Sequence, residues 1–266
     1  TAPEIAYVLE NCGAEFLFAE SAVLERVWTG LSELPSCQVI RLGEGAPSQS
    51  IVSVDEFTGA TGRDGPVRRR CGQIMPYTSG TTGRPKGVRR PLPDVDLDEY
   101  WGVSSRSSFE TLRLGCRADD VHLVVSPMYH TAIINLATSA LHVGHKVVLR
   151  ERFEPLDTLR AIERYRVTNA HMVPTQFHRL LSVDETVRQD FDLTSIRTLL
   201  HGAAPCPLTV KHRMIQWLGP VISEYYGASE GGGTIVSADE WLRRPGTVGR
   251  PYAGAEVHVL DDTGAP

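Results

Sequence analysis

The interpretation of the chain rests on one stretch, which reads Ile74-Met75-Pro76-Tyr77-Thr78-Ser79-Gly80-Thr81-Thr82-Gly83-Arg84-Pro85-Lys86-Gly87-Val88. It places four Ser or Thr hydroxyls, three glycines and one lysine in a short loop. Small residues let the backbone approach an anion closely, and hydroxyls, backbone N–H groups and a lysine all bind phosphate oxygens. The stretch therefore predicts a loop that holds a polyphosphate. A plain polar turn is the alternative, and the length of the motif disfavours it.

The stretch differs from the common nucleotide-binding loop. That loop reads Gly-x-x-x-x-Gly-Lys-Ser/Thr and leads into a helix at the lysine. Here Pro85 precedes Lys86 and Gly87 follows it, and a proline disfavours helical geometry in the residue before it. We therefore expect residues 77–88 to form a loop between two strands rather than a strand-to-helix cradle.

The order of residues from Thr78 to Gly87 resembles the phosphate-loop signature of the adenylate-forming enzymes. These enzymes comprise the acyl-CoA synthetases, the luciferases and the adenylation domains of peptide synthetases. The resemblance implies that the loop holds the β- and γ-phosphates of ATP, and that two of its residues, Thr78 and Lys86, take part in catalysis. The ATP-binding residues that it implies here are Thr78, Ser79, Gly80, Thr81, Thr82, Gly83 and Lys86.

A second motif, Glu224-Tyr225-Tyr226-Gly227-Ala228-Ser229-Glu230, resembles the aromatic-Gly-x-Thr-Glu motif of the same family. The resemblance implies that Tyr226 stacks on adenine, and that Glu224, Tyr225 and Gly227 border the nucleotide. Ser229 stands where threonine is usual and retains the hydroxyl that donates to the α-phosphate. Glu230 is implied as a catalytic residue and as a ligand of Mg²⁺, which takes one or two carboxylates plus nucleotide phosphates. A strand-end turn with a surface carboxylate is the alternative.

Two further segments follow apolar runs typical of strands. Ser126-Pro127-Met128-Tyr129-His130 and His201-Gly202-Ala203-Ala204-Pro205 are therefore expected where ligands bind in open α/β sheets, beyond the carboxyl ends of strands. The resemblance implies a catalytic, substrate-positioning role for His130. It also implies an adenine-binding role for Ala203, Ala204 and Pro205, with Gly202 beside the acyl group. A hydrogen-bonded structural histidine and a routine turn are the alternatives.

Three consecutive glycines, Gly231-Gly232-Gly233, cost backbone entropy and therefore need a reason. One reason is the floor of an acyl pocket, which makes Gly231 and Gly232 candidate substrate-binding residues; simple turn flexibility is the other. The segment Pro245-Gly246-Thr247-Val248-Gly249-Arg250-Pro251 resembles a further family segment, which is mainly structural.

Composition places the chain among ordinary globular proteins. Its 266 residues are 41% hydrophobic and 22% charged, with a net charge of −5, so bulk charge does not indicate nucleic acid as a partner. The five cysteines are spread along the chain without a C-x-x-C pair, which favours a reducing compartment over a disulfide framework. The sequence lacks an apolar run of about 18 residues, so we expect no transmembrane segment and a cytoplasmic location.

Apolar periodicity predicts strands that alternate with helices, and hence an α/β fold of layered subdomains with largely parallel sheets. Strands are expected at 15–19, 38–42, 121–125, 146–149, 170–173, 198–200, 221–225 and 256–260. Helices are expected at 4–11, 23–34, 54–57, 100–114, 132–141, 156–162, 174–181 and 208–218. A Gly-rich linker at 58–65 is the expected boundary. Residues 1–65 would then be part of a first subdomain, and residues 66–266 the nucleotide- and acyl-binding subdomain.

The resemblance implies a two-step reaction in which ATP and a carboxylic acid form an acyl-adenylate, and coenzyme A then displaces AMP. The acid is expected to be hydrophobic. The family's branch that activates amino acids usually carries an aspartate at the position of Thr131, so this neutral residue disfavours that branch. The resemblance covers only the middle of a family member and leaves out the C-terminal domain with its catalytic lysine. We therefore expect a fragment that binds ATP weakly and forms negligible thioester alone; a non-catalytic nucleotide-binding fragment is the alternative.

Overall fold

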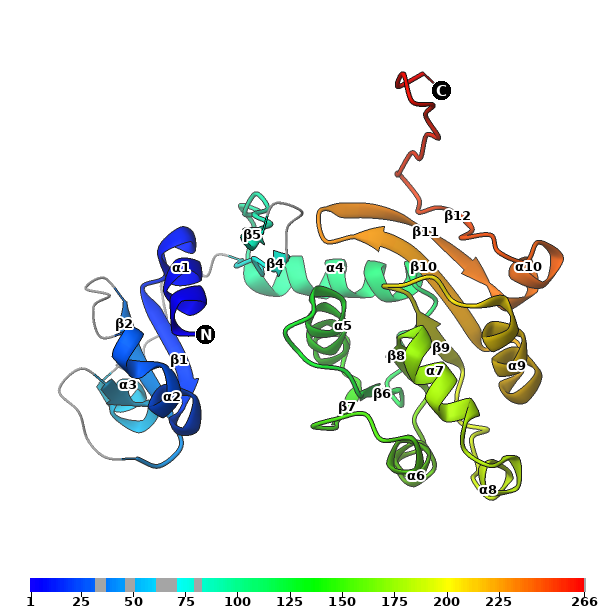
Figure 1. Cartoon of the computed structure of the whole chain (residues 1–266), viewed down its shortest axis with the longest axis horizontal. Coiled ribbons are helices and arrows are strands. Elements are labelled where there is room, and N and C mark those ends of the chain that lie inside the picture. Colours follow the sequence, from blue (N-terminus) through cyan, green and yellow to red (C-terminus); the bar gives the residue numbers. More distant parts are fainter. Residues whose placement is uncertain (32–36, 46–50, 61–70, 79–82, 266) are drawn as a thin grey trace. The chain divides into compact units, whose positions relative to one another are not determined.

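The computed structural model of the chain describes residues 1–31, 37–45, 51–60, 71–78 and 83–265. The chain divides into two compact units (Figure 1). The first comprises Thr1–Arg69 and Tyr77–Arg90, and the second comprises Arg70–Pro76 and Pro91–Pro266. Contacts thus group the predicted phosphate loop with the first unit, although the sequence grouped it with residues 66–266. The subdomain boundary at residue 65 stays a prediction.

The first unit contains a three-stranded parallel sheet in the order β1-β2-β3 with helices packed on it. Its first helix stops at Gly13, whose φ of +65° is the left-handed conformation that closes helices and that glycine adopts without strain. The helix expected at 4–11 is therefore present, and it extends from Ala2 to Cys12. The elements are α1 (Ala2–Cys12), β1 (Phe16–Glu20), α2 (Ser21–Leu31), β2 (Gln38–Leu42), β3 (Ile51–Ser53) and α3 (Val54–Ala60).

The second unit is built on a seven-stranded sheet in the order β12-β11-β10-β9-β8-β6-β7. Pairing is parallel from β7 to β10 and antiparallel from β10 to β12, which confirms the expected α/β fold with largely parallel sheets. The strands are β6 (Val121–Val124), β7 (Lys146–Leu149), β8 (Asn169–Met172), β9 (Thr198–His201), β10 (Ile222–Ala228), β11 (Gly231–Ser237) and β12 (Arg250–Pro251).

Helices cover both faces of this sheet (Figure 1). One face packs Leu123, Met172 and Leu199 against apolar residues of α6, α7 and α9, and the opposite face packs Leu200 against Phe109 of α4 and Leu136 of α5. Successive strand residues point to opposite faces, so β6, β8 and β9 are buried on both faces, and this burial includes polar residues such as His122, Asn169 and His201. The helices are α4 (Leu97–Thr111), α5 (Thr131–His142), α6 (Pro155–Tyr165), α7 (Pro174–Leu181), α8 (Glu185–Gln189), α9 (Leu208–Leu218) and α10 (Ala238–Arg243).

Several predicted elements are wrong in type or in extent. Residues 256–260 form no strand, and Val259 is 86% exposed, because this segment has no hydrogen-bonded partner strand among the described residues. Residues 58–60 belong to α3 rather than to a linker, and 61–65 lie outside the described residues. Helix α4 begins at Leu97, three residues earlier than expected, because the Asp96 carboxylate caps it by accepting from the N–H of Asp98 at 2.9 Å. The strand β11, which begins at Gly231, was not among the expected strands.

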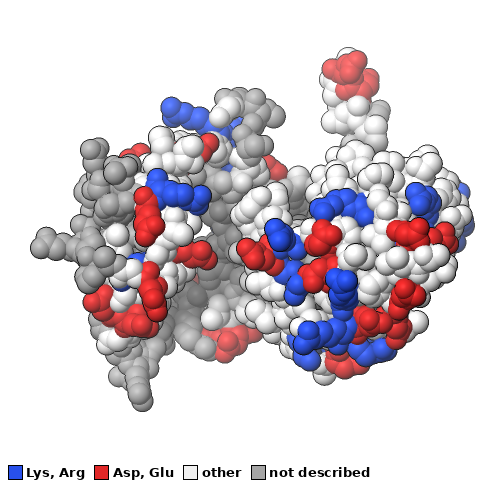
Figure 2. Space-filling view, turned by 60° about the horizontal axis from the view of Figure 1, so that its bottom comes forward, with Lys and Arg blue, Asp and Glu red and all other residues white. Residues whose placement is uncertain are grey.

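Among the described residues, none of the helices is both long and apolar enough to cross a membrane. On the face of the second unit drawn in Figure 2, Lys and Arg side chains alternate with Asp and Glu side chains. Mixed charges of this kind largely cancel at a distance, so this face exerts no strong general attraction on an anion.

Candidate active site

The phosphate-loop motif forms a hairpin in the first unit. Strands β4 (Tyr77–Thr78) and β5 (Lys86–Gly87) pair antiparallel, with Thr78 opposite Lys86. The hydroxyl of Thr78 donates to the carbonyl of Lys86 at 3.5 Å, and the Lys86 side chain is exposed. This confirms the loop between two strands. Gly83 has a φ of +90°, and the predicted residues Ser79, Gly80, Thr81 and Thr82 lie outside the described residues.

Helix α1 anchors this hairpin at both strands. The phenol of Tyr77 donates to the Asn11 side-chain oxygen at 2.7 Å. The phenol of Tyr7 donates to the carbonyl of Pro85 at 3.1 Å, and the Arg84 guanidinium lies 5.5 Å from the centre of the Tyr7 ring. The two tyrosines therefore hold the two ends of the phosphate loop to one helix. Sequence reasoning missed them, because nothing in the motif points to a helix about 70 residues away.

The remaining predicted residues lie at one edge of the sheet in the second unit. His130 follows β6, Gly202 follows β9, and Tyr226 lies near the end of β10. Since β6, β8, β9 and β10 run parallel, their carboxyl ends meet at the same edge, which is where open α/β sheets bind ligands. The fold thus brings together three segments that are up to about 100 residues apart in sequence.

A direct contact joins two of these segments. The Thr131 hydroxyl, in the first turn of α5, lies 3.3 Å from the Ser229 hydroxyl. His130 is the N-cap residue of α5; its side chain is exposed, and its ring lies 4.4 Å from that of Tyr129, centre to centre. The N-terminus of α5, whose free N–H groups favour anions, therefore faces the turn that carries Ser229.

Ser229 and Glu230 form the two-residue turn between β10 and β11. Glu230 is exposed in this turn, as a carboxylate that receives a cation together with nucleotide oxygens must be. Within the part of the chain that the structure describes, no three His, Cys, Asp or Glu residues gather into a metal site. A magnesium ion at Glu230 would take its other ligands from nucleotide phosphates and water, as Mg²⁺ ordinarily does.

The two tyrosines of the second motif have different environments. Tyr226 is 63% exposed, as a ring that stacks on a ligand must be before the ligand binds. Tyr225 is largely buried, and its ring covers Gly202 so closely that a Cβ on Gly202 would lie 2.7 Å from Cζ of Tyr225. Burial raises the pKa of Tyr225 to about 12. Tyr225 therefore packs against Gly202 as a neutral phenol.

The side chain of Glu224 is buried in the protein interior. Its carboxylate accepts from Nζ of Lys211 and lies 3.6 Å from Nε2 of His201. Lys211 is 1% exposed, and sequence reasoning gave it no role, because a lysine on an amphipathic helix is ordinarily a surface residue. The carboxylate of Glu224 is therefore held by Lys211, and the proposed contact of this residue with a nucleotide stays a prediction.

Apart from Gly202, which is buried, the small residues predicted for the site are exposed, and several take unusual conformations. Ala203 has a φ of +67°, which is uncommon for a residue with a side chain, and Ala203, Ala204 and Pro205 are all exposed. Gly231 and Gly232 are exposed at the start of β11, where their φ values are +124° and +72°. Backbone atoms in both segments are therefore open to a ligand at the sheet edge.

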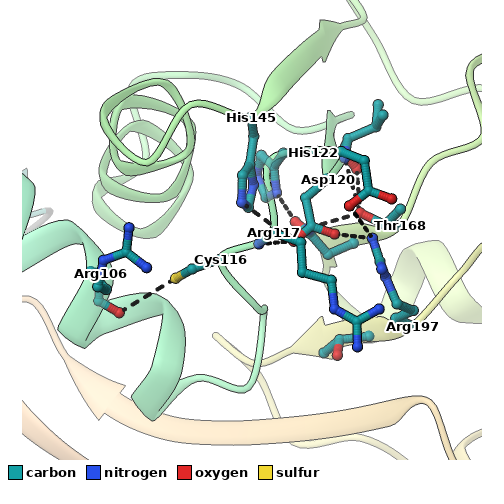
Figure 3. A network of polar contacts seen from close by, with 12 residues as sticks. Arg106, Cys116, Arg117, Asp120, His122, His145, Thr168 and Arg197 are labelled. Carbon is teal, nitrogen blue, oxygen red and sulfur yellow. Dashed lines mark hydrogen bonds and ion pairs between the residues drawn. The ribbon is translucent and has the colours of Figure 1, made fainter.

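A polar network lies at the opposite, amino ends of the strands (Figure 3). Asp120 is 2% exposed; it accepts from the N–H of Arg117 at 2.7 Å and from the guanidinium of Arg197, and it lies 3.5 Å from His145. Nearby, Nδ1 of His122 lies 2.5 Å from the Asn169 side-chain oxygen. None of these residues belongs to the predicted site, and the network ties β6, β7, β8 and β9 together.

The chain is similar in sequence to a known protein family and to several known enzymes. The family model described as "AMP-binding enzyme" matches residues 1–266. A relative from Mycobacterium tuberculosis (strain ATCC 25618 / H37Rv), named 3-[(3aS,4S,7aS)-7a-methyl-1,5-dioxo-octahydro-1H-inden-4-yl]propanoyl:CoA ligase, is 33% identical over 98% of this chain and 52% of its own length. The 2-succinylbenzoate–CoA ligase of Bacillus pumilus (strain SAFR-032) is 34% identical over 70% of this chain and 36% of its own length.

Solved structures agree with the sequence relatives. The o-succinylbenzoate CoA synthetase from Bacillus subtilis, in complex with the acyl-adenylate intermediate OSB-AMP, matches with a TM-score of 0.73 at 25% identity over 100% of this chain and 49% of that chain. The amide bond synthetase from Marinactinospora thermotolerans shares the fold, with a TM-score of 0.78 at 24% identity over 100% of this chain and 51% of that chain. This chain spans about half the length of the first of these curated relatives. Matched by the family model over all 266 residues, the chain belongs to the AMP-binding enzymes, the adenylate-forming family.

Proposed function

We propose that this chain is the nucleotide- and acyl-binding part of an ATP-dependent carboxylic acid:CoA ligase that works through an acyl-adenylate. The proposal rests mainly on one observation: at the carboxyl edge of the sheet, the N-terminus of α5 contacts the Ser229–Glu230 turn. The Thr131–Ser229 contact places the His130 segment next to the residues proposed for the α-phosphate and the metal. The curated relatives named as CoA ligases support the same reaction class.

In the first proposed step, a carboxylate oxygen of the acid attacks the α-phosphorus of ATP, and the bond to the departing pyrophosphate breaks. Thr78, Ser79, Thr81, Thr82 and Lys86 hold the β- and γ-phosphates. Ser229 donates to the α-phosphate, and Glu230 would hold a Mg²⁺ ion, which would neutralise phosphate charge. Positioning and charge stabilisation supply most of the acceleration in reactions of this kind.

In the second proposed step, the thiol of coenzyme A attacks the acyl carbonyl carbon and AMP leaves with the bonding electrons. His130, exposed at the α5 N-terminus, positions the acyl group between nucleotide and thiol. Tyr226, with Ala203, Ala204 and Pro205, seats adenine, while Gly202, Gly231 and Gly232 border the acyl group. A fatty or other hydrophobic acid is the proposed substrate, and the cytoplasm is the proposed location.

A ligase for amino acids is the second candidate in this family, and one observation counts against it. Such a site needs an anion for the substrate ammonium, but the residue after His130 is the neutral Thr131, whose hydroxyl contacts Ser229. A hydrophobic acid has no ammonium to balance, so it fits this edge better.

Nucleotide binding by these 266 residues tests the proposal directly. Isothermal titration with AMP, ATP and CMP, each with and without Mg²⁺, should show binding of the adenine nucleotides in preference to CMP. Glu230→Gln should weaken ATP binding about tenfold in Mg²⁺ and leave it unchanged in EDTA, since one charged metal ligand is lost. Glu256→Gln, at an exposed carboxylate outside the proposed site, is the matched control. Equal binding of CMP and AMP would reject an adenylate site.

Turnover is measured on the longest polypeptide that the gene encodes. Pyrophosphate release is followed across a panel of fatty, aryl and amino acids, with and without coenzyme A. Release with hydrophobic acids and CoA-dependent AMP formation are expected. Release with amino acids alone, without any effect of CoA, would replace the ligase by the amino-acid candidate.

A further inference from the structure

We infer that Lys211 is a positioning residue for the adenine seat, by which we mean the proposed adenine-binding surface formed by two segments of the chain. Its buried ion pair with Glu224 holds these two segments together. The inference rests on the proposed nucleotide site and goes beyond it, since Lys211 itself lies 1% exposed on α9. The two segments are residues 202–205, after β9, and residues 224–229, in β10 and the turn that follows it.

The contacts of Lys211 come from three elements. Its Nζ donates to Oε2 of Glu224 in β10 and lies 4.8 Å from the centre of the Trp241 ring in α10. The same Glu224 oxygen lies 3.6 Å from Nε2 of His201 in β9. Burial, and then the Lys211 ammonium, lower the pKa of His201 to about 2, so the imidazole is neutral and Lys211 is the cation that faces the carboxylate.

The ion pair closes a loop of chain around the adenine seat. His201 and Glu224 are neighbours in the β9–β10 register, and the chain between them runs through segment 202–205 into α9, which carries Lys211. Tyr225, the residue after Glu224, packs on Gly202 at the other end of the same segment. Segment 202–205 is therefore held to β10 at its beginning by Tyr225, and through α9 at its end by Lys211.

A charged pair is an expensive way to join two buried elements. Burial lowers the pKa of Lys211, which shows that the ammonium loses hydration there, although the bond to Glu224 opposes this shift. Apolar side chains of similar volume commonly replace such pairs without loss of stability. What apolar packing does not reproduce is a directional bond that fixes the distance between α9 and β10. We therefore assign the pair to positioning of segment 202–205 rather than to stability alone.

The test uses the neutral double variant Lys211→Met/Glu224→Gln, which keeps the volume of both side chains. Thermal unfolding and titration with AMP and GMP are measured on the 266-residue chain. We expect an unfolding midpoint close to that of the unchanged protein, AMP binding about tenfold weaker, and a lower ratio of AMP to GMP affinity. Lys146→Met, at an exposed lysine at the start of β7, is the matched control and should change none of the three.

Three other outcomes would contradict the positioning role of Lys211. An unchanged AMP affinity and AMP-to-GMP ratio in a folded double variant would overturn the inference and leave a purely structural ion pair. If the double variant does not fold, Lys211→Met alone, which removes the donor to Glu224, must show the lower ratio, and failure to do so overturns the inference. If the unchanged protein binds neither nucleotide, the proposed function itself fails, and the inference fails with it.

Discussion

The hydroxyl of Thr131 lies 3.3 Å from the hydroxyl of Ser229, although 98 residues separate them in sequence. One hydroxyl belongs to the first turn of α5 and the other to the turn of the β10–β11 hairpin. The contact brings the N-terminus of a helix, a place that favours anions, beside the hydroxyl that is proposed to donate to the α-phosphate.

Ser229→Ala is expected to weaken AMP binding about 10- to 150-fold, because a hydrogen bond to a charged phosphate contributes about 1.5–3 kcal/mol. Ser229→Thr keeps the hydroxyl and should bind AMP as the unchanged protein does. Isothermal titration measures both variants, and circular dichroism checks that both are folded. Equal AMP affinity for the alanine and threonine variants would remove Ser229 from the phosphate site.

Gly202→Ala is expected to destabilise the second unit by about 1–3 kcal/mol, since its Cβ would overlap the Tyr225 ring and force it to move. Urea unfolding measures the free energy of unfolding, and AMP titration should show weaker binding. Gly102→Ala, in α4 with nothing within 4 Å of its added Cβ, is the matched control and should stabilise by up to about 1 kcal/mol. A neutral Gly202→Ala variant would mean that Tyr225 does not pack as described.

Tyr77→Phe is expected to weaken ATP binding a few-fold and to leave AMP binding unchanged. The substitution keeps the ring and removes the 2.7 Å bond to Asn11, a loss of about 1 kcal/mol at the hairpin that carries the phosphate loop. AMP lacks the β- and γ-phosphates that this loop is proposed to hold. Titration with the two nucleotides tests this, and an equal loss for both would show that the hairpin affects more than those phosphates.

Asp120→Asn is expected to lower the free energy of unfolding by about 2 kcal/mol, because it leaves the Arg197 guanidinium without its buried carboxylate partner. AMP affinity should stay unchanged, since this network lies at the amino ends of the strands (Figure 3) and the proposed site lies at the carboxyl ends. Urea unfolding and AMP titration are measured side by side. Reduced AMP affinity with unchanged stability would contradict this separation.

Acid is expected to destabilise the second unit below about pH 6.5. Burial lowers the pKa values of His122 and His171 from 6.5 to about 4, so the unfolded chain binds more protons between these values. Stability is therefore full above pH 6.5 and falls towards pH 4, by up to about 3 kcal/mol for each histidine. His171→Leu removes one titrating group, and its stability should fall less steeply over this range in urea unfolding. Parallel curves for the two proteins would contradict the assignment.

Much of the fold could be predicted from local patterns in the sequence. The helix at 174–181, the helix at 208–218 and the strand at 38–42 lie where apolar periodicity predicted them. These segments are long or strongly periodic, so local pattern and final burial agree. Residues 256–260 and the glycine strand β11 show the limit of such reasoning. Whether an extended segment becomes a strand depends on a neighbouring strand to pair with, and the local sequence does not identify that neighbour.

The sequence by itself determined the family motifs: the phosphate loop from Thr78 to Gly87, and the hydroxyl and carboxylate of Ser229 and Glu230. Only the tertiary structure decided that Thr131 contacts Ser229, that Tyr225 covers Gly202, and that Lys211 is buried against Glu224. The physical reason is that a motif reports what a side chain can bind, whereas its partner is chosen by strand order and helix packing. From the sequence alone, Lys211 on α9 is interpreted as a solvated surface charge. The tertiary structure shows that it is buried against the carboxylate of Glu224 in β10.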